Sequence, residues 1–436
     1  MITERRNAAA AGSEGAGDEI KEVKARQVLD SRGNPTVEVD VWTRSGAFGR
    51  ASVPSGASTG IHEALELRDR GKEFGGLGVS KAVSNVNERI RHEIIGMSVL
   101  RQRDIDMLMV EMDGTPNKRR LGANAILGVS MAVARAAASY TKQSLYAYLE
   151  TQQSKELPLP MMNIINGGKH AGNNLAIQEF LVEPVSASGY SEALRMGVEI
   201  YHTLKNVLKD KYGPSAINVG DEGGYAPPLS KTEEALDCIM TAIIKTGYSE
   251  SDIKLGIDAA ASNFYASNMY QLDGKSLSSS ELEEFYSRLA DIYPIKTIED
   301  PFDEESFEDF ASITKRLGSR IKIIGDDIYV TNVGRIKKGI DEKSSNASLI
   351  KLNQIGTVTE TLQAVRLTKE AGWMVVVSHR SGETDDPFIA HFAVAVGSTF
   401  IKTGAPARGE RVSKYNELLR IEEEMGNTAR IAKIPV

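Results

Sequence analysis

A series of short apolar runs limits most strongly what this chain can fold into. Seven runs of three to five residues recur through its second part, at 162–165, 253–257, 295–298, 321–324, 347–350, 374–377 and 399–401. Each run ends in polar or glycine-rich sequence, and stretches with helical spacing, such as 231–245 and 357–370, separate most of them. This alternation of buried strands and helices predicts a parallel α/β fold.

Six of these runs have an ionisable side chain at or just past their last residue. These side chains are Asp258, Glu299, Asp326, Lys351, His379 and Lys402. They are 41, 27, 25, 28 and 23 residues apart, and one strand–helix unit takes roughly 25–40 residues. Each side chain therefore falls at the same place in successive units. In a barrel that place is the carboxyl end of the strands, where the active sites of this fold lie.

Each of these side chains also has a structural explanation when it is taken alone. An aspartate after a strand is often the N-cap of the next helix. A Glu-Asp-Pro sequence at 299–301 suits a turn, lysines usually lie in solvent, and a lone histidine is often structural. Six residues in register are harder to explain in this way. Three carboxylates at one mouth would repel one another without a cation between them, and all-oxygen ligands favour Mg²⁺ over zinc. The residues alone thus predict a barrel enzyme that holds a divalent cation beside lysines able to act as base or anion clamp.

The first part of the chain has a different pattern. Residues 1–19 are rich in Ala, Gly, Ser and Glu and predict a flexible tail. Alternation of apolar and polar residues in 36–42 predicts a half-buried strand. Helical spacing follows around 78–95, 101–112 and 121–140. Polar sequence at 152–156 then ends this part. We therefore predict an N-terminal α+β domain at 20–155 and a barrel at 156–436, a division that suits a chain of 436 residues.

Composition narrows the classes of partner and compartment. Fifty-nine acidic residues against 52 basic ones give a net charge of −7, which argues against a dedicated nucleic-acid binder. A single cysteine, Cys238, excludes an intramolecular disulfide and a thiolate metal cluster. The most apolar long stretch, 121–140, contains Asn124 and Arg135, so it predicts a buried helix and no membrane span. Because no export signal is visible, we expect a cytoplasmic protein.

Long motifs around these positions resemble the enolase family over most of the chain, from Lys24 to Met425. They are Asp30-Ser-Arg-Gly-Asn-Pro-Thr-Val-Glu38, Pro54-Ser-Gly-Ala-Ser-Thr-Gly60, Leu121-Gly-Ala-Asn-Ala-Ile-Leu-Gly-Val-Ser130, Asn218-Val-Gly-Asp-Glu-Gly-Gly224, Ile298-Glu-Asp-Pro-Phe302, Lys351-Leu-Asn-Gln-Ile-Gly356, Ser378-His-Arg-Ser-Gly-Glu-Thr384 and Ile401-Lys-Thr-Gly-Ala-Pro406. The resemblance implies a modified (β/α)8 barrel of order ββαα(βα)6 behind a smaller N-terminal α+β domain. It also implies a glycolytic and gluconeogenic lyase that reversibly dehydrates 2-phosphoglycerate to phosphoenolpyruvate.

The resemblance further implies a magnesium site and a general base. Asp258, Glu299 and Asp326 match the ligands of a first Mg²⁺, which holds the substrate carboxylate. Ser58 matches a residue that helps to hold a second Mg²⁺, which arrives with the substrate. Lys351 matches the general base, and it needs a depressed pKa to accept a proton at neutral pH.

Acid catalysis and substrate binding are implied in the same way. Glu222 matches the general acid and Glu179 its helper, because two neighbouring carboxylates that share a proton raise the pKa of one and make it a usable acid. His170 completes the catalytic set. The matched substrate-binding residues are Lys402, Arg380, Ser381, His379 and Gln178, of which Arg380 and Ser381 match a phosphate clamp.

The resemblance leaves the assembly and some local details open. Arg32, Glu38 and Arg420 match positions that pair across a dimer in the family, so we expect a homodimer, and an octamer also fits. Several positions depart from the usual family pattern, namely Lys169, Asn174, Tyr225, Asn263, His391 and Gly409. The alternative functions are another acid dehydratase of the enolase superfamily and a non-catalytic, enolase-like surface or structural binding protein.

Overall fold

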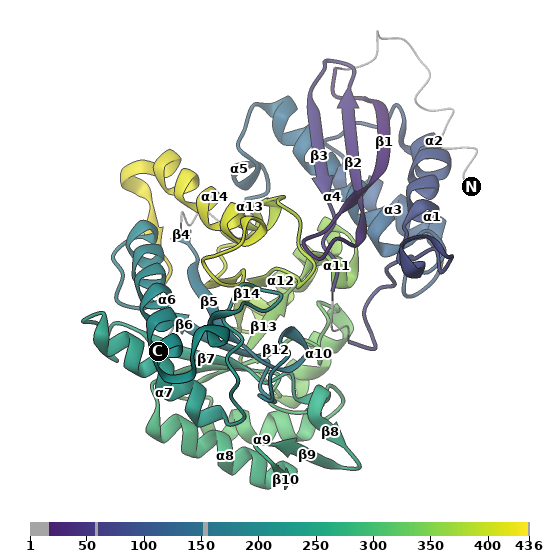
Figure 1. The fold of residues 1–436 in the computed structure, drawn as a ribbon. Coiled ribbons are helices and arrows are strands. Elements are labelled where there is room, and N and C mark those ends of the chain that lie inside the picture. Colours follow the sequence, from purple (N-terminus) through teal and green to yellow (C-terminus); the bar gives the residue numbers. More distant parts are fainter. Residues whose placement is uncertain (1–16, 57–59, 151–155, 435–436) are drawn as a thin grey trace.

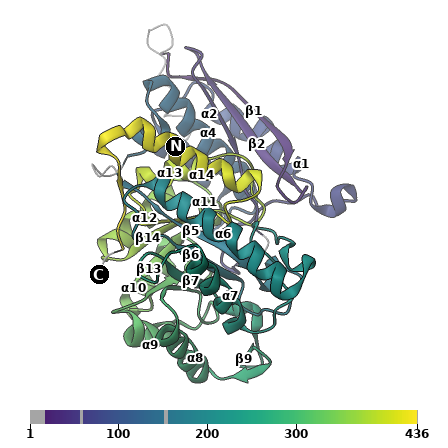
Figure 2. The ribbon, with the colours of Figure 1, turned by 60° about the vertical axis from the view of Figure 1, so that its left-hand side comes forward.

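The computed structural model describes residues 17–56, 60–150 and 156–434. A small antiparallel sheet with helices forms the first part of the chain, and a closed eight-stranded barrel forms the second. Figure 1 shows the first part, in purple and blue, as a separate layer beside the barrel, and Figure 2 shows the same arrangement after a turn of 60°. The predicted fold class, a barrel with a smaller α+β part before it, is confirmed.

The N-terminal sheet is a meander of three antiparallel strands. These are β1 (Ile20–Leu29), β2 (Pro35–Thr43) and β3 (Phe48–Ser52). Strand β2 contains the predicted alternating segment, and its Val37 and Val39 are fully buried. They pack against α4 (Ala123–Thr141), where a Cβ on Gly128 would stand only 2.7 Å from Cγ2 of Val39. The close approach explains why small residues fill this helix, which is buried along most of its length.

Shorter helices complete the N-terminal part. They are η1 (Glu73–Gly76), α1 (Ser80–Ser84), η2 (Asn85–Ile90), α2 (Arg91–Ile94), α3 (Gln102–Asp113) and α5 (Leu145–Tyr148). Residues 17–19, which the sequence assigns to the tail, are hydrogen bonded to this part: the carbonyl of Glu19 accepts from the amide of Arg44 at 2.9 Å. The rest of the predicted tail, 1–16, lies outside the described residues, as does 151–155, where the predicted domain boundary falls.

Eight strands close the barrel in the order β11-β12-β13-β14-β15-β5-β6-β7. Their bounds are β5 (Leu159–Asn166), β6 (Glu179–Glu183), β7 (Lys254–Asp258), β11 (Ile295–Glu299), β12 (Lys322–Gly325), β13 (Ala347–Ile350), β14 (Met374–Ser378) and β15 (Phe400–Lys402). Each of the seven predicted runs overlaps one of these strands. The remaining strand, β6, was missed because a glutamate stands at each of its ends, so it does not read as an apolar run.

Helices cover the outside of the barrel (Figures 1 and 2). They are α6 (Tyr190–Tyr212), α7 (Thr232–Lys245), α8 (Ser279–Ile292), α9 (Phe307–Leu317), α10 (Val333–Glu342), α12 (Val358–Glu370), α13 (Phe388–Ala395) and α14 (Gly409–Met425). Both α6 and α7 follow β6, and one helix follows each later strand, so the predicted order ββαα(βα)6 is confirmed.

Short elements lie between the barrel strands and helices, before the first barrel strand and after the last helix. They are η3 (Gly168–His170), η4 (Pro214–Ile217), η5 (Ala261–Phe264), α11 (Leu352–Ile355), η6 (Gly426–Thr428), the small sheet of β8 (Tyr265–Ala266), β9 (Met269–Leu272) and β10 (Lys275–Leu277), and the pair of β4 (Glu156–Leu157) with β16 (Arg430–Ile431).

Strand β6 runs in the opposite direction to the other barrel strands. It pairs antiparallel with both β5 and β7, whereas the other neighbouring strands of the barrel are parallel. Its first residue, Glu179, therefore lies opposite the last residue of β7, Asp258. The reversal brings the amino end of β6 to the same rim as the carboxyl ends of the other strands, where active sites of this fold lie.

The N-terminal part packs onto this same rim. The amide of Ser55 donates to the carbonyl of Gly382 at 2.7 Å, and the amide of Gly382 donates back at 2.8 Å. Arg135 of α4 binds Asp386 through both terminal nitrogens, at 2.8 and 2.6 Å. The Ser55–Gly382 pair joins residues 53–56 to the loop between β14 and α13, and the Arg135 contact joins α4 to the same loop. Among the described residues, none of the helices combines the length and the apolarity that a bilayer span requires.

Candidate active site

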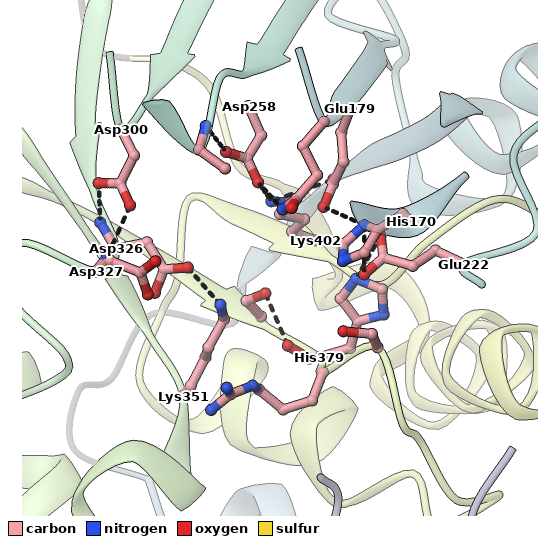
Figure 3. Close-up of a pocket in the computed structure, with 15 residues that line it drawn as sticks. His170, Glu179, Glu222, Asp258, Asp300, Asp326, Asp327, Lys351, His379 and Lys402 are labelled. Carbon is pink, nitrogen blue, oxygen red and sulfur yellow. Dashed lines mark hydrogen bonds and ion pairs between the residues drawn. The ribbon is translucent and has the colours of Figure 1, made fainter. Parts of the chain in front are cut away.

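Acidic side chains converge on one buried lysine at the mouth of the barrel (Figure 3). Lys402 is the last residue of β15 and is only 2% exposed. Its Nζ donates to Oδ2 of Asp258 at 2.9 Å and to both carboxylate oxygens of Glu299 at 2.9 Å. It also lies 3.1 Å from Oε2 of Glu179. Asp258 and Glu299 end two neighbouring parallel strands and lie opposite each other in the register, which explains why their carboxylates meet.

A second lysine lies beside the remaining predicted metal ligand. Lys351 follows β13, and its Nζ donates to Oδ2 of Asp326, which follows β12. The other oxygen of Asp326 accepts from Nε2 of Gln354 at 2.8 Å. Asp300 fixes the loop that follows β12, because its carboxylate accepts hydrogen bonds from the amides of Asp326 at 2.9 Å and Asp327 at 2.8 Å. Asp300 itself has a φ of 41°, a left-handed conformation that side chains other than glycine rarely adopt.

Beside the carboxylate of Asp326 the pKa of Lys351 is raised, so the depressed value that a general base needs stays a prediction for the metal-bound site. Burial lowers this pKa, but the attraction of the carboxylates, led by Asp326, outweighs the burial. The sequence placed both residues at the mouth, but it could not show that their side chains form a direct ion pair.

A third group joins two glutamates through a histidine. Nδ1 of His170 lies 3.6 Å from Oε1 of Glu179 and 3.5 Å from Oε1 of Glu222. Oε2 of Glu222 accepts from Nδ2 of Asn163 at 3.0 Å and lies 3.4 Å from Nε2 of His379. All five side chains are buried. Among the described residues, neither ring nitrogen of His170 has a hydrogen-bond partner, which is unusual for a buried imidazole and suits a ring that contacts a bound molecule.

The two glutamates differ in their affinity for a proton. Burial raises the pKa of Glu179, and the neighbouring charge of Glu222 raises it further. Burial also raises the pKa of Glu222, but the neighbouring His170 and His379 and the charge of Arg411 lower it to a final value below the usual range. Of the two carboxylates, Glu179 therefore holds a shared proton more tightly.

The predicted phosphate clamp already holds a carboxylate. Nη1 of Arg380 lies 2.9 Å from Oε2 of Glu63, and Nη2 lies 3.0 Å from Oε1 of the same side chain. Nη1 also donates to Oδ1 of Asn353 at 3.0 Å. Glu63 comes from the N-terminal part of the chain, a few residues after Ser55, which bonds to Gly382. The guanidinium is thus presented for the two-pronged binding of an anion, as a phosphate site needs.

One pocket collects nearly all of the predicted site residues. His170, Gln178, Glu179, Glu222, Asp258, Asp326, Lys351, His379, Arg380, Ser381 and Lys402 line it. Glu299 is absent from this lining but contacts it through Lys402. Ser58 lies outside the described residues. Asp300 and Asp327 also line the pocket and were not predicted, because nothing in the apolar pattern distinguishes them from turn residues.

The chemistry of the mouth fits a hard divalent cation. Carboxylates outnumber basic side chains there, and a buried excess of negative charge is costly unless protons or cations compensate it. Burial accordingly raises the pKa of Glu299 well above its usual range and that of Asp327 to about 8. The atoms that could bind a metal there are carboxylate oxygens, which suit Mg²⁺. The three predicted ligands share the mouth but two lysines divide them, since Lys402 binds Asp258 and Glu299 while Lys351 binds Asp326.

Comparison with known proteins agrees with this geometry. The family model described as "Enolase, N-terminal domain" matches residues 20–149, and the one described as "Enolase, C-terminal TIM barrel domain" matches residues 154–434. The enolase of Methanocaldococcus jannaschii is 59% identical over 408 residues, which cover 94% of this chain and 96% of the relative.

Two further archaeal relatives give the same result. The enolase of Methanothrix thermoacetophila is 59% identical over 95% of this chain and 98% of its own length. The enolase of Thermococcus gammatolerans is 55% identical over 94% of this chain and 96% of its own length. A family whose members depend on a metal ion also accounts for the excess of carboxylates at the mouth. The chain therefore belongs to the enolase family of phosphopyruvate hydratases.

Proposed function

We propose that this chain carries out the enolase reaction, the reversible dehydration of 2-phosphoglycerate to phosphoenolpyruvate, with Lys351 as base and Glu222 as acid. Nζ of Lys351 takes the proton from C2, and the electron pair moves into the carboxylate. The pair then returns to form the C2–C3 double bond as Glu222 protonates the hydroxyl on C3, which leaves as water. The observation that carries this proposal is the convergence of both lysines and the acidic side chains on one buried mouth.

We propose that Asp258, Glu299 and Asp326 hold one Mg²⁺ and that a second Mg²⁺ arrives with the substrate. Bound there, Mg²⁺ would supply positive charge for the doubly charged carboxylate that forms when C2 loses its proton. The raised pKa of Lys351 arises from its contact with Asp326, so a lysine that shares this carboxylate with a cation has a lower pKa and becomes a usable base. Ser58 remains a predicted ligand of the second ion.

The proton that Glu222 donates comes, in this proposal, from its partner Glu179. Glu179 holds the proton in the absence of substrate because its pKa is raised. His170 lies between the two carboxylates, 3.6 Å from one and 3.5 Å from the other, and so links them. Glu179 and His170 thus supply and orient the proton, and Glu222 delivers it to the departing hydroxyl.

Substrate binding uses the remaining side chains of the pocket. Arg380 and Ser381 bind the phosphate, and Lys402 contacts the substrate carboxylate. Because Glu63 occupies the guanidinium of Arg380, the phosphate has to displace that carboxylate. His379 and Gln178 complete the wall of the pocket. Binding of phosphate would therefore change the contact between Arg380 of the barrel and Glu63 of the N-terminal part.

The test is the absorbance of phosphoenolpyruvate as it forms from 2-phosphoglycerate. We expect formation with Mg²⁺ and none with excess chelator, because the carboxylates then lack their cation. Restoration of Mg²⁺ to the chelated sample should restore the rate, which controls for unfolding. Absence of any signal in Mg²⁺ from folded protein contradicts the proposal.

We also propose that the chain works in the cytoplasm as a homodimer or a higher homo-oligomer. Within the chain, Arg420 binds Glu417 at 2.6 Å and Glu38 binds Arg26 at 2.6 Å. Arg420 remains 66% exposed, so it is accessible to a second copy. Light scattering during size exclusion measures the assembly, and a mass of 47.4 kDa, that of one chain, contradicts it. Fractionation of cells that produce the chain tests the compartment.

A further inference from the structure

Arg411 is a fully buried cation that none of the roles above uses. It stands near the start of α14, and its exposed fraction is 0%. Four acceptors surround its two terminal nitrogens. Nη1 donates to Nδ1 of His379 at 2.6 Å and to the carbonyl of Arg380 at 2.6 Å. Nη2 donates to the carbonyls of Ser381 at 2.5 Å and Asp221 at 3.0 Å. Burial of a charge costs free energy of desolvation, and four directed hydrogen bonds fix the positions of the groups that accept them.

The contact with His379 determines where that ring carries its proton. A guanidinium has only donors, so Nδ1 of His379 has to be the acceptor and cannot itself be protonated. A neutral ring then carries its proton on Nε2, which lies 3.4 Å from Oε2 of Glu222. Burial and the charge of Arg411 lower the pKa of His379 to about 3, so the ring is neutral at neutral pH. The N–H of His379 is therefore directed at the acid.

The other contacts of Arg411 join the two loops on which this pair stands. The carbonyl of Asp221 belongs to the residue before Glu222, and the carbonyls of Arg380 and Ser381 belong to the phosphate segment. Gly404 leaves the room that this arrangement needs: with a φ of 83°, a Cβ there would stand 2.8 Å from the carbonyl of Glu222 and 2.9 Å from Cδ of Arg411. One guanidinium thus fixes the acid and the phosphate segment relative to each other.

We propose that Arg411 is a positioning residue, which holds His379 as the Nε2-protonated ring and so keeps the carboxyl group of Glu222 aimed at the departing hydroxyl. The inference rests on the proposed role of Glu222 as the acid. This role concerns only one half of the reaction, the protonation of the C3 hydroxyl. Arg411 bonds residues beside Glu222, and among the hydrogen bonds of the described residues it makes none with Lys351. Loss of Arg411 should therefore impair the protonation of the C3 hydroxyl more than the removal of the C2 proton.

The kinetic test compares two rates in deuterated water. One is the formation of phosphoenolpyruvate, and the other is the exchange of the C2 hydrogen of 2-phosphoglycerate with solvent. In Arg411→Met we expect product formation to fall by about a hundredfold and exchange by less than about fivefold, since general acid catalysis contributes roughly 10²–10⁴. Arg411→Lys, which keeps a donor for Nδ1, should recover part of the lost product formation. Equal losses of both rates in Arg411→Met overturn the proposal.

A matched control comes from the next turn of the same helix. Lys414 is also fully buried and donates to the carbonyls of Thr384 and Glu410, with its Nζ 2.9 Å from Oε2 of Glu383. It makes no contact with His379 in the described residues. Lys414→Met should lower both rates in the same proportion, as a general loss of stability does. A selective loss of product formation in this control would show that any buried charge in α14 has the effect, and it would overturn the proposal.

A second measurement needs no variant that folds poorly. The unaltered protein contains six histidines, and long-range proton–nitrogen spectra of protein with ¹⁵N-labelled histidine report the tautomer of each ring. The signal of His379 is assigned by its loss in His379→Gln. We expect a proton on Nε2 and none on Nδ1 of this ring, and the reverse tautomer contradicts the proposal. The result does not depend on the role of Glu222. In contrast, a Glu222→Gln variant that still forms product would overturn the proposed acid and leave the tautomer unaffected.

Discussion

The two ends of strand β6 carry the same residue in two different environments. Glu179 at the rim and Glu183 at the floor are four positions apart, so they lie on the same face of the strand, and both are buried. Glu179 lies 3.1 Å from the Nζ of Lys402, and the neighbouring charge of Glu222, the proposed acid, raises its pKa. Glu183 accepts a hydrogen bond from Oγ1 of Thr297 at 2.5 Å, and its Oε2 has no hydrogen-bond partner among the described residues.

The difference shows that a buried carboxyl group with a raised pKa is not by itself a catalytic group. Burial raises the pKa of both side chains, that of Glu183 to about 8. At the rim, Lys402 and a second carboxylate, Glu222, both act on Glu179, and in the proposed function its proton passes to that carboxylate. At the floor, no second carboxylate contacts Glu183 among the described residues, and its carboxyl group stays protonated up to a pKa of about 8. The comparison predicts that substitutions at the rim act on turnover and that those at the floor act on stability.

The largest expected effect is at the rim, in Lys351→Ala. Removal of the proposed base should reduce turnover by at least about three powers of ten, because the other lysine of the pocket, Lys402, is held by Asp258 and Glu299. It should reduce hydrogen exchange at C2 by as much as product formation. Steady-state rates together with the exchange rate measure both effects, and circular dichroism controls for folding. Turnover within a factor of ten of the parent would refute the assignment of the base.

A smaller loss is expected when the rim glutamate of β6 is changed. Glu179→Gln keeps the shape of the side chain but cannot store a proton, so product formation should fall by about two powers of ten. The pH dependence sharpens the test. The raised pKa of Glu179 means that the parent loses this proton only well above the usual range of a glutamate, and a fall in turnover with rising pH that depends on this group should be absent in Glu179→Gln. An unchanged pH profile would show that the proton is held elsewhere.

The sequence could predict the strand ends because periodicity encodes them. Apolar runs mark buried strands, so the ionisable residue after each run had to lie on the rim, and the structure confirms this for Asp258, Lys351 and Lys402. Strand β6 was missed because its polar ends hide its apolar centre. The resemblance supplied Glu179 and Glu222, but the ion pair of Lys351 with Asp326, like the proton affinity of each glutamate, depends on packing that no local pattern records.

The sequence pattern also could not predict side-chain contacts between residues that lie far apart in the chain. Glu63 reaches Arg380 across 317 positions, and Arg411 reaches His379 across 32. Each pair is built by the packing of loops from different elements, and loops carry no periodic signal. Asp300 was read as turn chemistry, and it does cap the loop of Asp326, although this loop belongs to the site.

Magnesium should stabilise the chain through the rim alone. A ligand that binds only the folded state adds about 2.7 kcal/mol to the free energy of unfolding at 100 times its dissociation constant. We expect this gain in the parent and in Glu183→Gln, and we expect its loss in Asp258→Asn, which removes a predicted ligand and keeps the shape. Thermal or urea unfolding at increasing Mg²⁺ measures it. A gain of equal size in Asp258→Asn would place the ion elsewhere.

The smallest effect is expected at the floor, in Glu183→Gln. Turnover should stay within about twofold of the parent, since the side chain lies at the far end of β6 from the mouth. The folded chain keeps the proton of Glu183 up to a pKa of about 8, whereas an unfolded glutamate with a pKa of 4.5 loses it earlier. Between these pH values the folded state binds one more proton than the unfolded state. The contribution of Glu183 to stability is therefore complete below pH 4.5, declines steadily as the pH rises from 4.5, and is lost once the pH has passed through the folded pKa of about 8.

Glutamine has no such proton to lose, so the stability of Glu183→Gln lacks the decline with rising pH that Glu183 causes in the parent. The free energy of unfolding of Glu183→Gln, relative to the parent, should rise by about 1 kcal/mol between pH 6 and pH 7. The side-chain oxygen of glutamine still accepts from Thr297, so the variant keeps the hydrogen bond and isolates the charge. Urea unfolding at the two pH values measures the difference, and other titrating groups cancel because both proteins share them. A difference that does not change with pH would mean that Glu183 is ionised in the folded chain. The contrast between the two ends of β6 would then have to come from the neighbours of each carboxylate and not from its protonation.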